Sequence, residues 1–169
     1  AEVAFRKAAA LDGVYKEAIL ELAALYEDKG DLDKAIEIYA EFPEHAAAAE
    51  HRAILLIRTG KPAEAAPLLE RLLAGEPGNA ALRLTYGRVL RDLKKYPAAA
   101  AEFVKAVQAK PDFVEAWGEL AAVFILLEDH PDALAALDRL KALGAEQPGH
   151  LYLRAIMLDE AKQPKLALE

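Results

Sequence analysis

Apolar side chains recur at helical spacing in paired blocks along most of the chain, and a short turn separates the two blocks of each pair. In the clearest pair, one block runs over residues 82–93 and the other over residues 99–107. Proline is tolerated in a first helical turn, where its missing N–H has no intrahelical partner to lose. Second helices are therefore predicted to begin near four prolines: Pro62, Pro97, Pro131 and Pro164. The pattern predicts a series of helical hairpins.

The predicted hairpins share a single period. Small residues stand 34 residues apart in two registers: Ala53, Gly87, Ala121 and Ala155 in first helices, and Ala65, Ala99, Ala133 and Ala167 in second helices. Helix axes approach closely only where side chains are small, so we expect the two registers to face each other. Such a period indicates an array of stacked hairpins, an architecture that presents a long open surface to other proteins.

The alternation of small and large apolar residues resembles the tetratricopeptide repeat (TPR), most clearly in Trp117-x-x-Leu120-Ala121-x-x-Phe124 followed by Ala133, Leu137 and Leu140. The resemblance covers essentially the whole chain and implies an all-α fold, a right-handed α-solenoid of antiparallel helical hairpins. It implies one array over residues 1–169: the second helix of a truncated repeat at 1–13, a short repeat at 16–45, full repeats at 46–79, 80–113 and 114–147, and a partial repeat at 148–169.

Two irregularities interrupt the pattern. The step from Ala23 to Ala53 is 30 residues rather than 34, which removes about one helical turn and keeps the facing of the helices. We therefore expect a shortened second helix over residues 32–42, stopped by Pro43. Pro67 lies inside the next second helix, where it removes a backbone hydrogen bond.

The composition of the chain argues against several classes of function. The formal net charge of -7 disfavours nucleic acid, whose phosphates are bound mainly by lysine and arginine. The chain has no cysteine and no serine, no HExxH motif and no histidine pair at i, i+4, so we expect no metal, cofactor or catalytic centre. The absence of cysteine fits a reducing compartment such as the cytoplasm. Since no apolar run approaches the roughly 20 residues that span a bilayer, we expect a soluble chain without direct membrane insertion.

The candidate site follows from the phase of the repeat. If positions 4, 7, 8 and 11 of each first helix face the core, then positions 2, 5, 9, 12 and 13 face away from it, and in TPR arrays this set lines the concave groove. An apolar set at these positions, with arginines beside it, predicts a groove that binds a protein or peptide. The predicted groove residues are Glu50, Ile54, Ile57, Arg58, Leu84, Arg88, Arg91, Ile125, Tyr152 and Ile156, with Leu126 beside them.

Two interpretations of this set stay open. In one, apolar anchors hold an extended or helical peptide while Arg88 and Arg91 hold an acidic group of that peptide. In the other, neighbouring first helices bury some of the apolar residues, and the arginines pair with Glu50 and Asp92. The basic clamp with which some TPR domains grip chaperone tails is absent.

Two functions of other classes compete with a non-catalytic binding scaffold. The array begins and ends within a repeat, so apolar end faces could be covered by end-to-end self-association. The segment could also be the recruiting arm of a larger multidomain enzyme.

Overall fold

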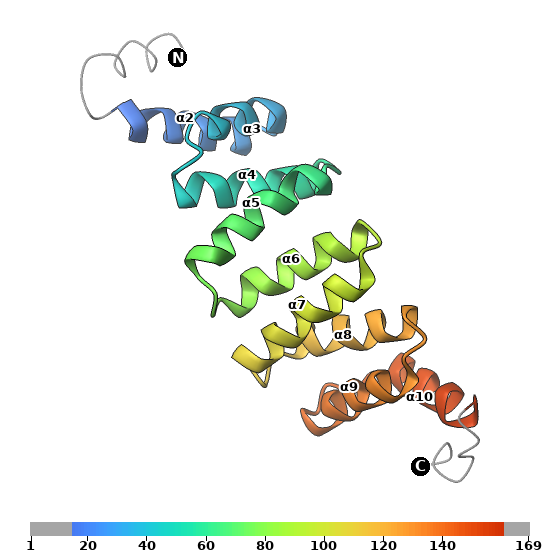
Figure 1. The fold of residues 1–169 in the computed structure, drawn as a ribbon. Coiled ribbons are helices and arrows are strands. Elements are labelled where there is room, and N and C mark those ends of the chain that lie inside the picture. Colours follow the sequence, from blue (N-terminus) through green and yellow to red (C-terminus); the bar gives the residue numbers. More distant parts are fainter. Residues whose placement is uncertain (1–14, 161–169) are drawn as a thin grey trace. The chain divides into compact units, whose positions relative to one another are not determined.

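The computed structural model describes the backbone of residues 15–160 and the side chains of residues 17–158 (Figure 1). Every regular element in this range is an α-helix. The expected helix at 1–13 and the second helix of the last repeat lie outside the described residues. The helices are α2 (Tyr15–Asp28), α3 (Leu32–Ala40), α4 (Ala46–Arg58), α5 (Pro62–Gly75), α6 (Ala80–Asp92), α7 (Tyr96–Ala109), α8 (Val114–Leu126), α9 (His130–Ala142) and α10 (Pro148–Glu160).

The helices form two compact units, Ala1–Glu76 and Pro77–Glu169. In the first unit, α2 packs on α3 and α4 on α5, and α3 contacts α4. In the second unit, α6 packs on α7 and α8 on α9, while α7 contacts α8 and α9 contacts α10. The expected helical hairpins are therefore present. None of the described helices has the length and apolar character needed to cross a membrane.

Second helices begin as the prolines predict, because Pro62, Pro97 and Pro131 each lie at the first or second position of a helix. The shortened second helix is also present, since α3 has 9 residues against 14 in α5. It ends at Ala40, two residues before the predicted end. A residue before proline avoids the α conformation, and the N–H of Phe42 bonds the carbonyl of Tyr39 in a tighter turn instead.

The turn inside each hairpin has the same backbone design. A residue with positive φ follows each first helix: Gly30, Gly60, Lys94 and Glu128. At Lys94, its own N–H bonds the carbonyl of Arg91, and the next N–H bonds that of Leu90. This pair of bonds is a Schellman motif, which satisfies the last carbonyls of a helix and favours glycine at the left-handed residue. The first unit supplies glycine there and the second unit does not.

Side-chain hydrogen bonds hold the turns between hairpins. The carbonyl of Pro43 accepts a hydrogen bond from Arg71, and the carbonyl of Pro111 accepts one from Arg139 at 3.4 Å, in each case 28 residues later in the chain. The indole Nε1 of Trp117 also donates to the Pro111 carbonyl, at 3.0 Å. Trp117 is half-buried and packs against the core.

The small registers meet large side chains in the core. Ala53, Ala65, Ala99, Ala121 and Ala133 are buried, and so are Leu69, Phe103 and Leu137 on the second helices. Burying a side chain of that size contributes about 1.5–3 kcal/mol. The closest approach is at Gly87, where an added Cβ would lie 2.4 Å from the ring of Phe103. Packing against α7 therefore favours glycine at this position.

Candidate functional site

The structure places the predicted groove residues at three depths. Six are exposed, three are half-buried and one is buried. The exposed ones are Glu50, Ile54, Arg58, Arg88, Tyr152 and Ile156; the half-buried ones are Ile57, Arg91 and Ile125. Leu126, beside this set, is also exposed. Outward-facing first-helix positions thus carry exposed apolar side chains in both units.

Leu84 is the exception, because the structure buries it. It is 6% exposed and belongs to the same apolar cluster as Leu120 of the next first helix. The expectation that Leu84 joins an exposed patch is therefore wrong, and its burial beside a neighbouring first helix agrees with the second interpretation of this set. The reason is the neighbouring hairpin: α6 contacts α8 directly, and this contact cannot be deduced from the phase of a single helix.

The arginines of the second unit pair with a carboxylate that the repeat pattern did not predict, that of Glu119. Nε of Arg88 donates to Oε1 of Glu119 at 2.7 Å, and Nη1 of Arg91 donates to Oε2 of the same carboxylate. Arg91 also pairs with Asp92, at 3.1 Å. Burial by itself lowers the pKa of Arg91, but the hydrogen bonds and charges of Asp92 and Glu119 outweigh it, and the pKa is raised. The two arginines therefore link α6 to α8.

This arrangement distinguishes the two arginines. Pairing of an arginine with Asp92 is confirmed for Arg91, whereas Arg58 pairs with Glu27 at 3.1 Å and not with Glu50. The side chain of Arg88 is 44% exposed, and neither of its terminal nitrogens bonds a described residue. Arg88 thus keeps hydrogen-bond donors that face solvent.

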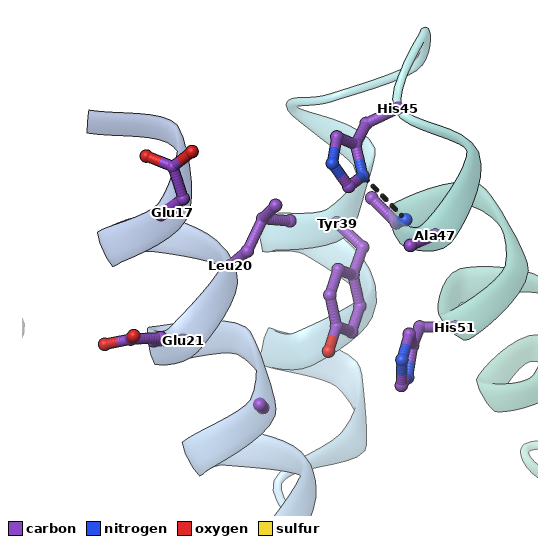
Figure 2. A pocket seen from close by; sticks show the side chains of 9 residues that line it. Glu17, Leu20, Glu21, Tyr39, His45, Ala47 and His51 are labelled. Atoms are coloured by element: carbon purple, nitrogen blue, oxygen red, sulfur yellow. Dashed lines mark hydrogen bonds between the residues drawn. The ribbon is translucent and has the colours of Figure 1, made fainter. Parts of the chain in front are cut away.

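A pocket of about 430 Å³ lies in the first unit, among α2, α3 and α4 (Figure 2). Its walls are largely apolar: Leu20 and Ala24 come from α2, and Ala47 and Ala48 come from α4. Figure 2 shows the side chain of Leu20 directed toward Tyr39 of α3. Pockets that bind small molecules commonly have volumes of about 300–1,000 Å³ and mostly apolar walls with a few polar groups.

The polar groups of the pocket lie at its base and its mouth. Tyr39 is 3% exposed and stacks on His51, with ring centroids 5.3 Å apart. Nδ1 of His51 lies 3.4 Å from Oε2 of Glu27. Burial raises the pKa of the Tyr39 hydroxyl, and the charges of Glu27 and Asp28 raise it further. Nδ1 of His45 accepts a hydrogen bond from the N–H of Ala48 and caps α4.

The sequence pattern did not predict this pocket. A signal was present: Ala47 and Ala48 line the pocket with Leu20 and Ala24, next to the shortened helix α3. Small side chains on two facing helices leave space, but nothing in one repeat shows that its neighbour does not fill it.

The chain was compared with known proteins. Family models described as Tetratricopeptide repeat match residues 11–42, 39–80, 50–112 and 84–150. The Vi polysaccharide export protein VexE of Salmonella typhi is 39% identical over 71 residues, which are 42% of this chain and 11% of that protein. The match therefore spans only a small part of VexE.

Solved structures share the fold at low identity. A crystal structure of MamA protein has a TM-score of 0.82 at 16% identity and covers 93% of this chain and 88% of its own. MamA from residue 41 to its end, from Desulfovibrio magneticus RS-1, has a TM-score of 0.76 at 18% identity. The match covers 90% of this chain and 89% of that chain. YrrB, described as a TPR protein with an unusual peptide-binding site, has a TM-score of 0.73 at 20% identity, with 94% and 80% covered. The expected class, an all-α solenoid of TPR type, is confirmed.

Proposed function

Because the chain belongs to the tetratricopeptide repeat family, we propose that it is a non-catalytic protein-interaction scaffold that binds a peptide segment along its first helices. TPR proteins are generally interaction scaffolds, and YrrB is described as having a peptide-binding site. That likeness is one of fold, so the argument for peptide binding rests on the side chains of this chain.

The observation that carries the proposal is the exposure of large apolar residues at outward-facing first-helix positions of the second unit. Leu126 is 51% exposed, Tyr152 68% and Ile156 37%. Solvated helix faces are mainly charged, and contiguous exposed apolar side chains are typical of contact surfaces. On α10, Tyr152 and Ile156 are four residues apart and share one face, which suits alternate side chains of an extended peptide or one side of a helix.

Arg88 gives this surface a preference for an acidic group. Its terminal nitrogens remain available while Nε bonds Glu119. Hydrogen bonds between an arginine and a carboxylate are charge-assisted and stronger than neutral ones. Arg91 has two carboxylate partners already, so we assign the ligand-holding role to Arg88 and a linking role to Arg91.

The test is selection of binders from a displayed library of random 12-residue peptides, followed by affinity measurements with a fluorescein-labelled selected peptide. We expect Tyr152→Glu and Ile156→Glu each to weaken binding by about tenfold, the effect of losing an interface anchor. Val114→Glu is the matched control, because Val114 is as exposed as Ile156, at 37%, but lies at the start of α8 outside the groove positions. Arg88→Gln should weaken the binding of peptides that contain a carboxylate and leave the binding of their amide analogues unchanged.

Three results would contradict the proposal. The first is that the selected peptides do not compete with one another for binding. The second is that the Val114→Glu control loses as much affinity as Ile156→Glu. The third is that both α10 variants bind the peptide with normal affinity. Circular dichroism of each variant checks that the helices remain intact, so that a loss of binding is a loss of surface.

A further inference from the structure

We propose that the pocket among α2, α3 and α4 binds a lysine or arginine side chain of a partner peptide. This inference rests on the proposed scaffold function and deepens it, because it names the chemistry of a second contact, in the first unit. It is opposite in charge to the contact expected at Arg88.

The shape of the pocket suits a long side chain with an apolar stem. Leu20, Ala24 and Ala47 supply apolar walls, and a volume of about 430 Å³ leaves ample room for such a stem. Lysine and arginine bury their methylene groups along apolar surface while the charged head stays near polar groups or water. A purely aliphatic side chain would fill the same walls but would leave the polar groups described next without a partner.

The lining carries two carboxylates and neither lysine nor arginine. The carboxylates are those of Glu17 and Glu21, and the other ionisable side chains are Tyr39, His45 and His51. Both carboxylates are on α2, both are exposed, and neither pairs with a described residue. Figure 2 shows Glu21 directed away from Tyr39, and an exposed side chain of this kind is free to turn toward a ligand. Charge complementarity therefore favours a cation at the mouth.

Tyr39 supplies the second, independent observation. It lines the pocket and is 97% buried, yet its hydroxyl bonds no described residue. A hydroxyl oxygen offers two acceptor lone pairs, and lysine and arginine are donors with no acceptor of their own. Burial raises the pKa of this hydroxyl, and the charges of Glu27 and Asp28 raise it further, so the hydroxyl stays protonated and keeps its acceptor lone pairs. Because Tyr39 lines the pocket, its hydroxyl oxygen can accept a hydrogen bond from a ligand that donates.

The experiment is an NMR titration of the whole ¹⁵N-labelled chain with three blocked tripeptides, acetyl-Gly-X-Gly-amide, in which X is arginine, norleucine or glutamate. We expect the arginine tripeptide to shift the amide signals of Leu20, Ala24 and Ala47 in a saturable manner. The norleucine tripeptide keeps the stem without the charge, and we expect it to bind about fivefold more weakly, the scale of two exposed ion pairs. The glutamate tripeptide should not bind.

Matched variants test the charge and the hydroxyl. Glu17→Gln with Glu21→Gln should weaken the arginine tripeptide by about fivefold. Glu37→Gln with Glu70→Gln is the control, because it changes the net charge equally at exposed positions outside the pocket, and it should have no effect. Tyr39→Phe should weaken the arginine tripeptide and leave the norleucine tripeptide unchanged.

Several results would overturn the inference. Equal affinities for the arginine and norleucine tripeptides would show an apolar pocket without charge selection. An unaltered affinity in the Glu17/Glu21 variant would show that these carboxylates do not contact the ligand. If agmatine bound more tightly than the arginine tripeptide, the site would be one for a small cation and not for a peptide. These outcomes are separable from failure of the proposed function, which is measured by α10 variants in the other unit.

Discussion

Neighbouring first helices meet through the same two repeat positions in both units, but the charges are arranged differently. In the first unit, Glu27, the twelfth residue of its repeat, lies beside His51, the sixth residue of the next, with 3.4 Å between Oε2 and Nδ1. In the second unit, the twelfth residue is Arg91 and the sixth is Glu119, and they form a direct ion pair. The repeat thus determines which side chains meet, and the residue types determine how strongly.

Later in the second unit, the same two repeat positions carry apolar residues. They are Ile125 and Leu153, and both pack against the core cluster of the second unit. A charged or apolar side chain at a nominal groove position is therefore not, by itself, evidence of ligand contact. In this chain the outward-facing positions divide into those that link neighbouring helices, such as Arg91, and those that remain free, such as Tyr152.

The largest expected effect comes from breaking the closest helix contact. Gly87→Ala would place a Cβ 2.4 Å from the buried ring of Phe103, and overpacking of this kind costs about 1–3 kcal/mol. The higher helix propensity of alanine returns about 1 kcal/mol, so we expect a net loss of up to about 2 kcal/mol. Urea unfolding followed by the fluorescence of Trp117, the single tryptophan, reports on the second unit directly.

The first unit supplies the control for this substitution. There the equivalent pair is Ala53 and Leu69, and both are buried without a glycine. Phe103→Leu in the Gly87→Ala background should therefore restore part of the lost stability, although Phe103→Leu alone is destabilising. A more stable Gly87→Ala variant would contradict the packing argument, because helix propensity would then outweigh the contact.

A smaller effect is expected from removing the carboxylate between the arginines. Glu119 is 15% exposed and accepts from both Arg88 and Arg91, so Glu119→Gln should destabilise the second unit by about 1 kcal/mol. Glu27→Gln should cost less in the first unit, because its partners His51 and Arg58 are more than half exposed. Urea unfolding at low and high salt measures both, and the loss at Glu119 should persist better in salt.

A double-mutant cycle isolates the pair in the second unit. Glu119→Gln, Arg91→Gln and the double variant should give a coupling energy of about 0.5–1 kcal/mol. A coupling near zero would show that Arg91 does not link the helices. It would then be as free for a ligand as Arg88.

The repeat pattern predicts the hairpins well because its evidence is local and repeated. The prolines mark where second helices begin, and the missing four residues before Ala53 predict the short helix α3. The pattern did not identify Leu84 as the residue that is buried, or Glu119 as the partner of Arg88, since both depend on a side chain in the next hairpin. The pocket at Tyr39 was missed for the same reason, as space between helices is defined by what neighbours leave unfilled.

The smallest expected effect lies in the turns inside the hairpins, where the two units share a backbone and differ in sequence. Gly60 has φ +73° in the first unit, whereas Lys94 has φ 58° in the second, and both close the same Schellman motif. A left-handed conformation costs a residue with a Cβ roughly 1–2 kcal/mol, while glycine adds about 0.4–1 kcal/mol of conformational entropy to the unfolded chain. Lys94→Gly should therefore stabilise the second unit by about 0.5 kcal/mol.

Two further variants are the controls for Lys94→Gly. Gly60→Ala should destabilise the first unit, and Lys94→Ala separates the loss of charge from the gain in backbone freedom. Trp117 fluorescence in urea gives the shift for Lys94→Gly, and a result no better than that of Lys94→Ala would show that the left-handed residue carries no strain.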